Sequence, residues 1–248
     1  KIHEARPQAV FAPHVETSAG IILPDDYIAR IAAAAHEVGA LMVLDCIASG
    51  CIWVDMAATG VDVLISAPQK GWSASPATGV VVMSPRAEAR LAETTSNSFV
   101  VDLKKWRAIM AAYEGGGHAY HATMPTDAIL GFRDAMLETK AMGFAEAKAA
   151  QWALGRAVRA MLAAKGVPSV AAEGFQAPGV VVSFTTDPDI QNGSKFKALG
   201  YQIAAGVPLQ VGEGAEFRTF RLGLFGLDKL KDVDATVARL KTALDQVL

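Results

Sequence analysis

Three short apolar runs near the start of the chain, alternating with helical segments, constrain its fold most strongly. A continuous apolar run bounded by polar and turn residues is typical of a parallel strand that is buried on both faces. We expect an amphipathic helix over Asp25–Val38, ended by Gly39. Alternation of such strands and helices predicts an α/β fold with a largely parallel sheet. The runs are Ala40–Asp45, Asp62–Ala67 and Gly79–Met83, and Gln8–Val15 resembles them.

The second half of the chain has a different pattern. After the irregular, glycine-rich segment Tyr113–Pro125, apolar residues at helical spacing predict a long helix over Thr126–Lys165, with a kink or break at Gly143 or Gly155. Beyond it we expect a smaller α+β unit. Its strands are predicted over Val180–Phe184, Tyr201–Ala205 and Arg218–Leu222, and its helices over Ile190–Leu199 and Asp228–Val247. The predicted division is a large domain over 1–125, a connecting helical region over 126–165 and a small C-terminal domain over 166–248.

Composition excludes several classes of function. Hydrophobic residues make up 52% of the chain and charged residues 19%, so a sizeable core can form. The net charge is −2 with no basic block, which predicts no nucleic-acid partner, and the apolar runs are too short to cross a membrane. There is no signal-peptide pattern. The only cysteines, Cys46 and Cys51, are too few for a disulfide framework, so we expect two buried thiols and a cytoplasmic location.

Two residues that follow predicted strands carry the first chemical signal. Asp45 closes one apolar run, and Lys70 lies 25 residues later, just beyond the next run. Ligands of parallel sheets bind at the carboxyl ends of the strands, where both residues are expected. Desolvation in a cleft favours the neutral amine that forms a Schiff base, and a carboxylate can pair with a protonated pyridine nitrogen. Taken singly, Lys70 is better explained as a surface lysine, and Asp45 is equally well explained as a capping or loop residue.

Several motifs in order make the sequence more specific. The motifs are His14–Gly20 (HVETSAG), Leu44–Ser49 (LDCIAS), Asp62–Lys70 (DVLISAPQK), the predicted turn Pro76–Gly79 (PATG), Tyr120–Pro125 (YHATMP) and Arg221–Gly223 (RLG). Together they resemble the class V, fold-type I, aminotransferases that depend on pyridoxal 5'-phosphate (PLP), in the branch of the alanine–glyoxylate and serine–glyoxylate or serine–pyruvate enzymes. The resemblance implies a mostly parallel PLP-binding domain, present in part, and a small α+β C-terminal domain.

The resemblance implies roles for residues around the cofactor ring. Lys70 would form the Schiff base and then move the substrate proton. Asp45 would hold the pyridine nitrogen, and Ile47 would pack on one face of the ring. Thr17 would hydrogen-bond near the ring, and Gln69 would contact the phosphate.

Further roles concern the partner subunit and the substrate. Tyr120 and Thr123 would reach the phosphate of the neighbouring subunit's cofactor, which implies a homodimer with shared active sites. Arg221 would bind the substrate carboxylate, a role that suits the planar fork of arginine. Arg218 competes for this role. On one strand the two arginines, three positions apart, would face opposite sides, so only one can enter the site.

The implied reaction is transamination of a small amino acid, alanine or serine, with glyoxylate or pyruvate as the 2-oxo acid acceptor. Two alternatives stay open. One is a PLP-dependent lyase or cysteine desulfurase, although that branch has histidine where Gln69 precedes the lysine. The other is a truncated, non-catalytic fragment, because the chain begins at Lys1 and lacks the family's N-terminal part with its phosphate loop and stacking aromatic. Pro68 departs from the family pattern and has no N–H for a phosphate.

Other features have simpler interpretations. Gly115–Gly117 lacks the context of a phosphate loop, and a flexible loop that serves Tyr120 and Thr123 explains it better. The pair His118 and His121 lacks a third nearby ligand, so we predict no metal. Trp72 is either an aromatic lid or a packing residue.

Overall fold

The larger of the two main sheets has the strand order β1-β4-β5-β6 in the computed structural model, which describes all residues 1–248. The strands β1, β4 and β5 are parallel, as the apolar runs predict, whereas β6 is antiparallel to β5. Because β6 returns directly along β5, the segment that contains Lys70 is a closed loop at one edge of the sheet. The strand bounds are Ala9–Pro13 (β1), Leu41–Asp45 (β4), Val63–Ser66 (β5) and Val80–Met83 (β6).

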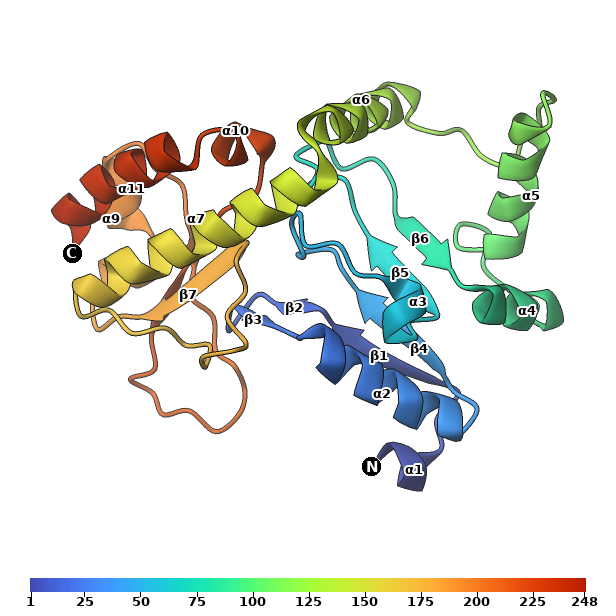
Figure 1. Cartoon of the computed structure of the whole chain (residues 1–248), viewed down its shortest axis with the longest axis horizontal. Helices are drawn as coiled ribbons and strands as arrows, with labels where there is room; N and C mark the ends of the chain where they lie inside the picture. Colours follow the sequence, from blue (N-terminus) through green and yellow to red (C-terminus); the bar gives the residue numbers. More distant parts are fainter.

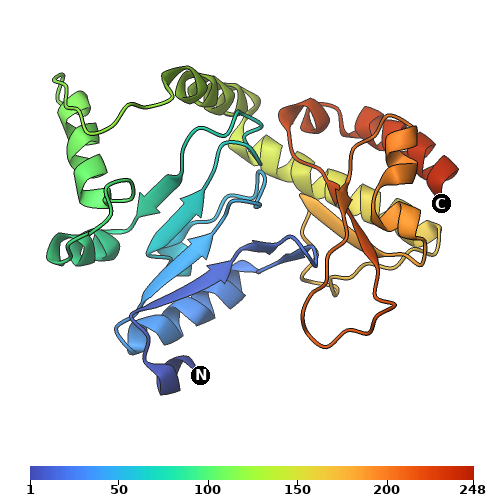
Figure 2. The same cartoon turned by 180° about the vertical axis from the view of Figure 1, so that it is seen from behind.

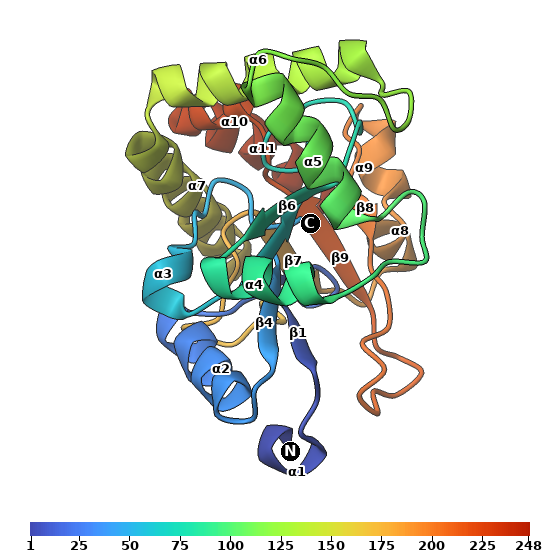
Figure 3. The ribbon, with the colours of Figure 1, turned by 90° about the vertical axis from the view of Figure 1, so that its right-hand side faces the viewer.

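One face of this sheet is covered by helix α2 (Asp25–Glu37), with the short α3 (Met56–Thr59) on the same side (Figure 3). Ile28 and Ala32 of α2 pack on Met42 and Leu44 of β4 in one buried cluster. Alternate residues point to the other face. Phe11, which pairs in register with Val43, lies on that face and is 73% exposed.

A hairpin connects the larger sheet with the rest of the molecule. Its strands, β2 (Val15–Glu16) and β3 (Ile21–Ile22), continue from the end of β1 toward the second sheet (Figure 1). The amide of Ile22 donates to the Phe175 carbonyl at 2.8 Å, and the amide of Ala177 donates to the Gly20 carbonyl at 2.9 Å. The hairpin, which belongs to the first half of the chain, is therefore hydrogen-bonded to residues of the second half.

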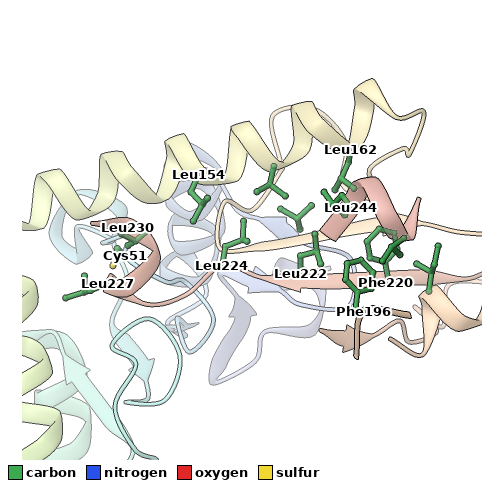
Figure 4. Packing of buried hydrophobic residues seen from close by; sticks show 14 of the residues in the cluster. Cys51, Leu154, Leu162, Phe196, Phe220, Leu222, Leu224, Leu227, Leu230 and Leu244 are labelled. Carbon is green, nitrogen blue, oxygen red and sulfur yellow. The ribbon is translucent and has the colours of Figure 1, made fainter. Parts of the chain in front are cut away.

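The second sheet is antiparallel, in the order β7-β9-β8. Helices α7 and α11 pack along it, and Figure 4 shows Leu154 and Leu162 of α7 directed toward Leu224 and Leu244. This cluster is the largest apolar core of the protein. The bounds are Val180–Phe184 (β7), Ala204–Ala205 (β8), Thr219–Gly223 (β9), Phe144–Ala164 (α7), Leu227–Leu230 (α10) and Val233–Val247 (α11).

The predicted long helix is two helices, α6 (Thr126–Met142) and α7, which are separated at Gly143. Gly143 has a φ of 100°, a conformation that favours glycine, so the chain changes direction there. Gly155 does not interrupt α7. A Cβ at Gly155 would lie 2.5 Å from the Pro178 Cα, so this glycine permits close packing of the helix.

Three further differences concern helices. The predicted helix over Ile190–Leu199 is divided into α8 (Pro188–Gln191) and α9 (Ser194–Ala198) by Gly193, and the closing helix is divided into α10 and α11. Helix α5 (Leu103–Glu114) was not predicted. Together with α4 (Pro85–Glu93) it lies beyond β6 (Figures 1 and 2). The short α1 (Ile2–Ala5) precedes β1, and none of the helices is long and apolar enough to cross a membrane.

Candidate active site

The carboxyl ends of β1, β4 and β5 lie side by side, so the loops that follow them meet at one edge of the sheet. Asp45 is the last residue of β4 and pairs in register with Pro13 on one side and Ile65 on the other. The amide of His14 donates to the Asp45 carbonyl at 2.8 Å. Asp45 is thereby fixed between the neighbouring strands at the edge where the sequence predicted it.

The Asp45 side chain is exposed at this edge. Its Oδ1 accepts a hydrogen bond from the Ile47 amide at 2.9 Å, which orients the carboxylate relative to its own loop. Among its protein contacts, Oδ2 accepts no hydrogen bond, and no Lys, Arg or His forms an ion pair with the carboxylate. One carboxylate oxygen is thus available to a ligand, with the half-buried Ile47 two residues away.

Lys70 lies in a turn that starts at Pro68. The amide of Ser73 donates to the Lys70 carbonyl at 3.0 Å, and the amide of Ala74 donates to the Pro68 carbonyl at 3.1 Å. The turn predicted over 76–79 is therefore not observed, since the turn of this loop lies over 68–72 and none forms at 76–79. Lys70 and Gln69 are exposed, and neither side chain is engaged by another protein group.

The loop of Lys70 packs against the loop of Asp45. A Cβ placed on Gly71 would lie 2.6 Å from the Gly50 carbonyl oxygen and 2.8 Å from the Gly50 Cα. Only a residue without a side chain allows this approach of two backbones. The contact holds Lys70 beside the loop that follows Asp45.

Arg221 brings the second sheet to the same edge. It lies in β9, and its Nε donates to the Ala205 carbonyl at 2.7 Å, while its Nη1 is 3.5 Å from the Thr17 carbonyl in the β2–β3 turn. Arg218 precedes β9 and pairs instead with Glu216 at 2.8 Å. Of the two arginines that compete for the site, Arg221 is the one that contacts the turn containing Thr17.

Tyr120 and Thr123 lie elsewhere, in the connection between α5 and α6. Tyr120 is 77% exposed, and its hydroxyl is 3.2 Å from the Thr123 hydroxyl. Nearby, His121 Nε2 is bonded to the Phe99 carbonyl, and no group of three potential metal ligands converges anywhere in the structure. Tyr120 and Thr123 therefore form a pair, but their hydrogen bonds do not involve the loops of Asp45 and Lys70.

Trp72 is a packing residue, which decides between the two predicted interpretations. Its ring lies 5.1 Å from that of Trp53 and 5.9 Å from that of Phe132 in α6. The Trp53 indole N–H in turn donates to the Phe144 carbonyl at 2.8 Å. Through Trp72, this aromatic cluster anchors the turn of Lys70 to Trp53 and to helix α6.

Two buried residues of the site were not predicted. His14 follows β1 and is 1% exposed, and its Nδ1 is 2.7 Å from the hydroxyl of Ser49, which is 3% exposed. Burial lowers the pKa of His14 to about 4, so its ring is neutral at pH 7. Both residues lie within motifs of the sequence, but the pairing of two segments 35 residues apart has no local signal.

The cysteines are buried as predicted. Desolvation raises the pKa of Cys46 to about 12 and that of Cys51 to about 11. Neither thiol ionises near neutral pH, so neither is a nucleophile there.

Comparison with known proteins finds relatives that match nearly the whole chain. A 2-aminoethylphosphonate–pyruvate transaminase of Syntrophobacter fumaroxidans is 28% identical over 93% of this chain and 60% of its own length. A protein of a Synechococcus strain named as the small subunit of a soluble hydrogenase is 27% identical over 99% of this chain and 62% of its own. The crystal structure of an alanine–glyoxylate aminotransferase from Nostoc sp. superposes with a TM-score of 0.83 at 22% identity, over 99% of this chain and 63% of that one.

The chain thus spans about three fifths of the length of these relatives. The fold is that of the PLP-dependent enzymes of fold type I, as the motifs implied. Residues 1–205 match the family described as Aminotransferase class-V. Because that match covers most of the sequence, the chain belongs to the class-V aminotransferase family.

Proposed function

We propose that this chain supplies the lysine, the carboxylate for the ring nitrogen and the substrate arginine of a PLP-dependent aminotransferase. The observation that carries the proposal is the meeting of three loops and one strand of the second sheet at the carboxyl edge of β4. Asp45, Lys70 and Arg221 come from separate elements that are joined there by direct contacts. The division into domains over 1–125, 126–165 and 166–248 is part of the same proposal.

The side chains at this edge fit PLP in their chemistry. The free oxygen of Asp45 can accept a hydrogen bond from a protonated ring nitrogen, and Lys70 offers an amine that no protein group engages. Ile47 offers an apolar surface beside the carboxylate. Thr17 and Gln69 add polar groups for the ring and the phosphate.

When bound, PLP withdraws electrons from the Cα of the amino acid, so that its proton becomes removable. In our proposal Lys70 would hold the cofactor through Nζ. The same Nζ would be the base that takes the proton from the substrate Cα and the acid that later returns it. Asp45 keeps the ring nitrogen protonated throughout. Arg221 binds the carboxylate of the substrate and orients Cα toward Lys70.

The partner in this proposal is a second copy of the chain. Tyr120 and Thr123 are exposed and hydrogen-bonded to each other, and neither side chain bonds to the loop of Lys70. As a pair of hydroxyl groups on an exposed connection, they suit contact with the phosphate of the neighbouring subunit's cofactor. The homodimer with shared active sites is the arrangement that uses them.

The proposed substrates are a small amino donor, alanine or serine, and glyoxylate or pyruvate as acceptor. Among the relatives are proteins named as 2-aminoethylphosphonate–pyruvate transaminases, and a guanidinium binds a phosphonate as well as a carboxylate. The informative assay therefore tests alanine, serine and 2-aminoethylphosphonate with each acceptor. Turnover with none of the three donors would contradict the proposed substrate class.

Reductive capture tests the role of Lys70 directly. The chain is incubated with PLP, treated with borohydride, digested and analysed by mass spectrometry. We expect the cofactor mass on the Lys70 peptide, its loss in Lys70→Ala, and full retention in Lys140→Ala, since Lys140 is an exposed residue at the end of α6. Capture that persists in Lys70→Ala at the wild-type level would overturn the proposal.

The desulfurase alternative requires a cysteine that can ionise. Cys46 and Cys51 are buried with raised pKa values of about 12 and 11, which disfavours this chemistry within the chain. Sulfide release from free cysteine is the measurement that separates the two reactions, and we expect none above the rate of Lys70→Ala.

A further inference from the structure

The hydrogen bond between His14 and Ser49 adjoins the candidate site, because the His14 amide also donates to the Asp45 carbonyl. His14 is the first residue after β1, and Ser49 is in the loop after β4. The two side chains are almost fully buried and meet at 2.7 Å. A buried polar pair is retained only when its hydrogen bond is made, because each group left unpaired loses its solvation.

This bond joins the two loops that carry the candidate cofactor residues. On one side, the chain passes from His14 through β2 to Thr17. On the other side, Ser49 closes the loop that begins at Asp45 and includes Ile47, and the Ser49 amide donates to the Cys46 carbonyl at 3.2 Å. The main chain repeats the connection, since the His14 amide donates to the Asp45 carbonyl. His14 therefore contacts the Asp45 loop at two positions, Asp45 and Ser49.

The surroundings keep the His14 ring neutral. Burial is the main cause of its lowered pKa, while Asp25 at the start of α2 and Lys148 of α7 act in opposite directions. A neutral ring has one donor and one acceptor nitrogen, so it can bond the Ser49 hydroxyl without placing a charge behind the Asp45 carboxylate. This arrangement suits a fixed connection and does not suit proton transfer.

We propose that His14 and Ser49 are positioning residues, whose buried hydrogen bond holds the loop of Asp45 and Ile47 against the loop of Thr17 before the cofactor binds. The inference rests on the proposed function for its purpose. Its physical content, the coupling of two loops, is independent of PLP and can be measured without it.

The experiment is hydrogen exchange by mass spectrometry on the cofactor-free chain, followed on peptides that contain Thr17 and Ile47. In Ser49→Ala and in His14→Leu we expect exchange in both segments to be faster by about tenfold, because removal of one partner opens both loops. His14→Asn, which keeps a polar atom at the δ position, should exchange within about threefold of wild type. The matched control is Ser183→Ala, the same change at a buried serine of β7, which should leave both segments unchanged.

Cofactor binding gives a second readout. PLP is titrated into each variant and followed by visible absorption. We expect Ser49→Ala and His14→Leu to weaken binding by about tenfold, and His14→Asn and Ser183→Ala to bind as wild type does. If His14→Leu also unfolds the chain, as judged by circular dichroism, Ser49→Ala and His14→Asn still give the comparison.

The two proposals fail in different ways. Equal exchange in Ser49→Ala and wild type, or faster exchange in only one of the two segments, would overturn the positioning role. Either outcome would be compatible with the proposed role of Lys70. Wild-type chain that takes up no PLP, together with faster exchange in both segments of Ser49→Ala, would contradict the proposed function and support the coupling of the loops.

Discussion

Replacement of Gly71 by alanine tests whether the loop of Lys70 depends on its close approach to the loop of Asp45. The new Cβ would lie 2.6 Å from the Gly50 carbonyl oxygen, 2.7 Å from the Gly50 carbonyl carbon and 2.8 Å from the Gly50 Cα. All three atoms belong to the backbone, so no side chain can rotate away. One loop has to move.

The cost follows from this geometry. Overpacking by one methyl group costs about 1–3 kcal/mol when the surroundings cannot yield. For a chain of this size, each 1 kcal/mol lowers the melting temperature by about 2–4 °C, so the expected decrease is about 2–12 °C. If the loop of Lys70 moves instead, part of this energy appears as weaker cofactor capture and the melting temperature falls less.

The assay combines thermal unfolding with borohydride capture of PLP on Lys70. Gly79→Ala is the control, because Gly79 is in the same loop and its added Cβ meets nothing within 4 Å. Gly→Ala at an unstrained position raises stability by about 0.4–1 kcal/mol. If Gly71→Ala melts no lower than Gly79→Ala and captures PLP equally well, the contact between the loops is not the constraint that we infer.

The remaining predictions concern buried and half-buried groups. Arg159 donates to the Ala177 carbonyl at 2.8 Å and to the Ser169 hydroxyl at 2.9 Å, so Arg159→Met should lower the free energy of unfolding in urea by about 2–4 kcal/mol; a change below 0.5 kcal/mol would refute this. Cys46 and Cys51, with pKa values of about 12 and 11, should resist iodoacetamide at pH 8 until the chain is unfolded, as intact mass will show. His14 has a folded pKa of about 4 against 6.5 when unfolded, so the unfolded chain binds the extra proton between these values and stability falls as the pH falls. From pH 7 to pH 5 the loss should be about 2 kcal/mol, and it should vanish in His14→Asn.

The sequence is most informative where local chemistry alone determines structure. The apolar runs that end at Asp45 and Ala67 became parallel strands, as continuous apolar runs bounded by polar residues predict. Asp25 after Pro24 marked the start of α2 at the correct residue. Because the predicted parallel strand ends at Asp45, the position of Asp45 at the carboxyl edge of the sheet could also be predicted.

Sequence reasoning was weaker where distant packing decides. Gly143 and Gly155 are equivalent in a helical pattern, yet only Gly143, with a φ of 100°, ends a helix, whereas Gly155 stays within α7 and lets the backbone of Pro178 approach closely. Helix α5 has only a weak apolar stripe and no buried residue, so its pattern was not recognised. The choice between Arg218 and Arg221 required the β2–β3 turn, which is far away in sequence.

The direction of β6 has a consequence for the order of folding. Because β6 returns along β5, with Ser66 opposite Val80, Lys70 is in a loop closed by neighbouring residues of the sequence. The contact of Arg221 with Thr17, in contrast, spans 204 residues. Short-range contacts form with a smaller loss of chain entropy and therefore earlier. We expect the lysine side of the site to assemble as a local unit, and the arginine to complete it only when the second sheet docks.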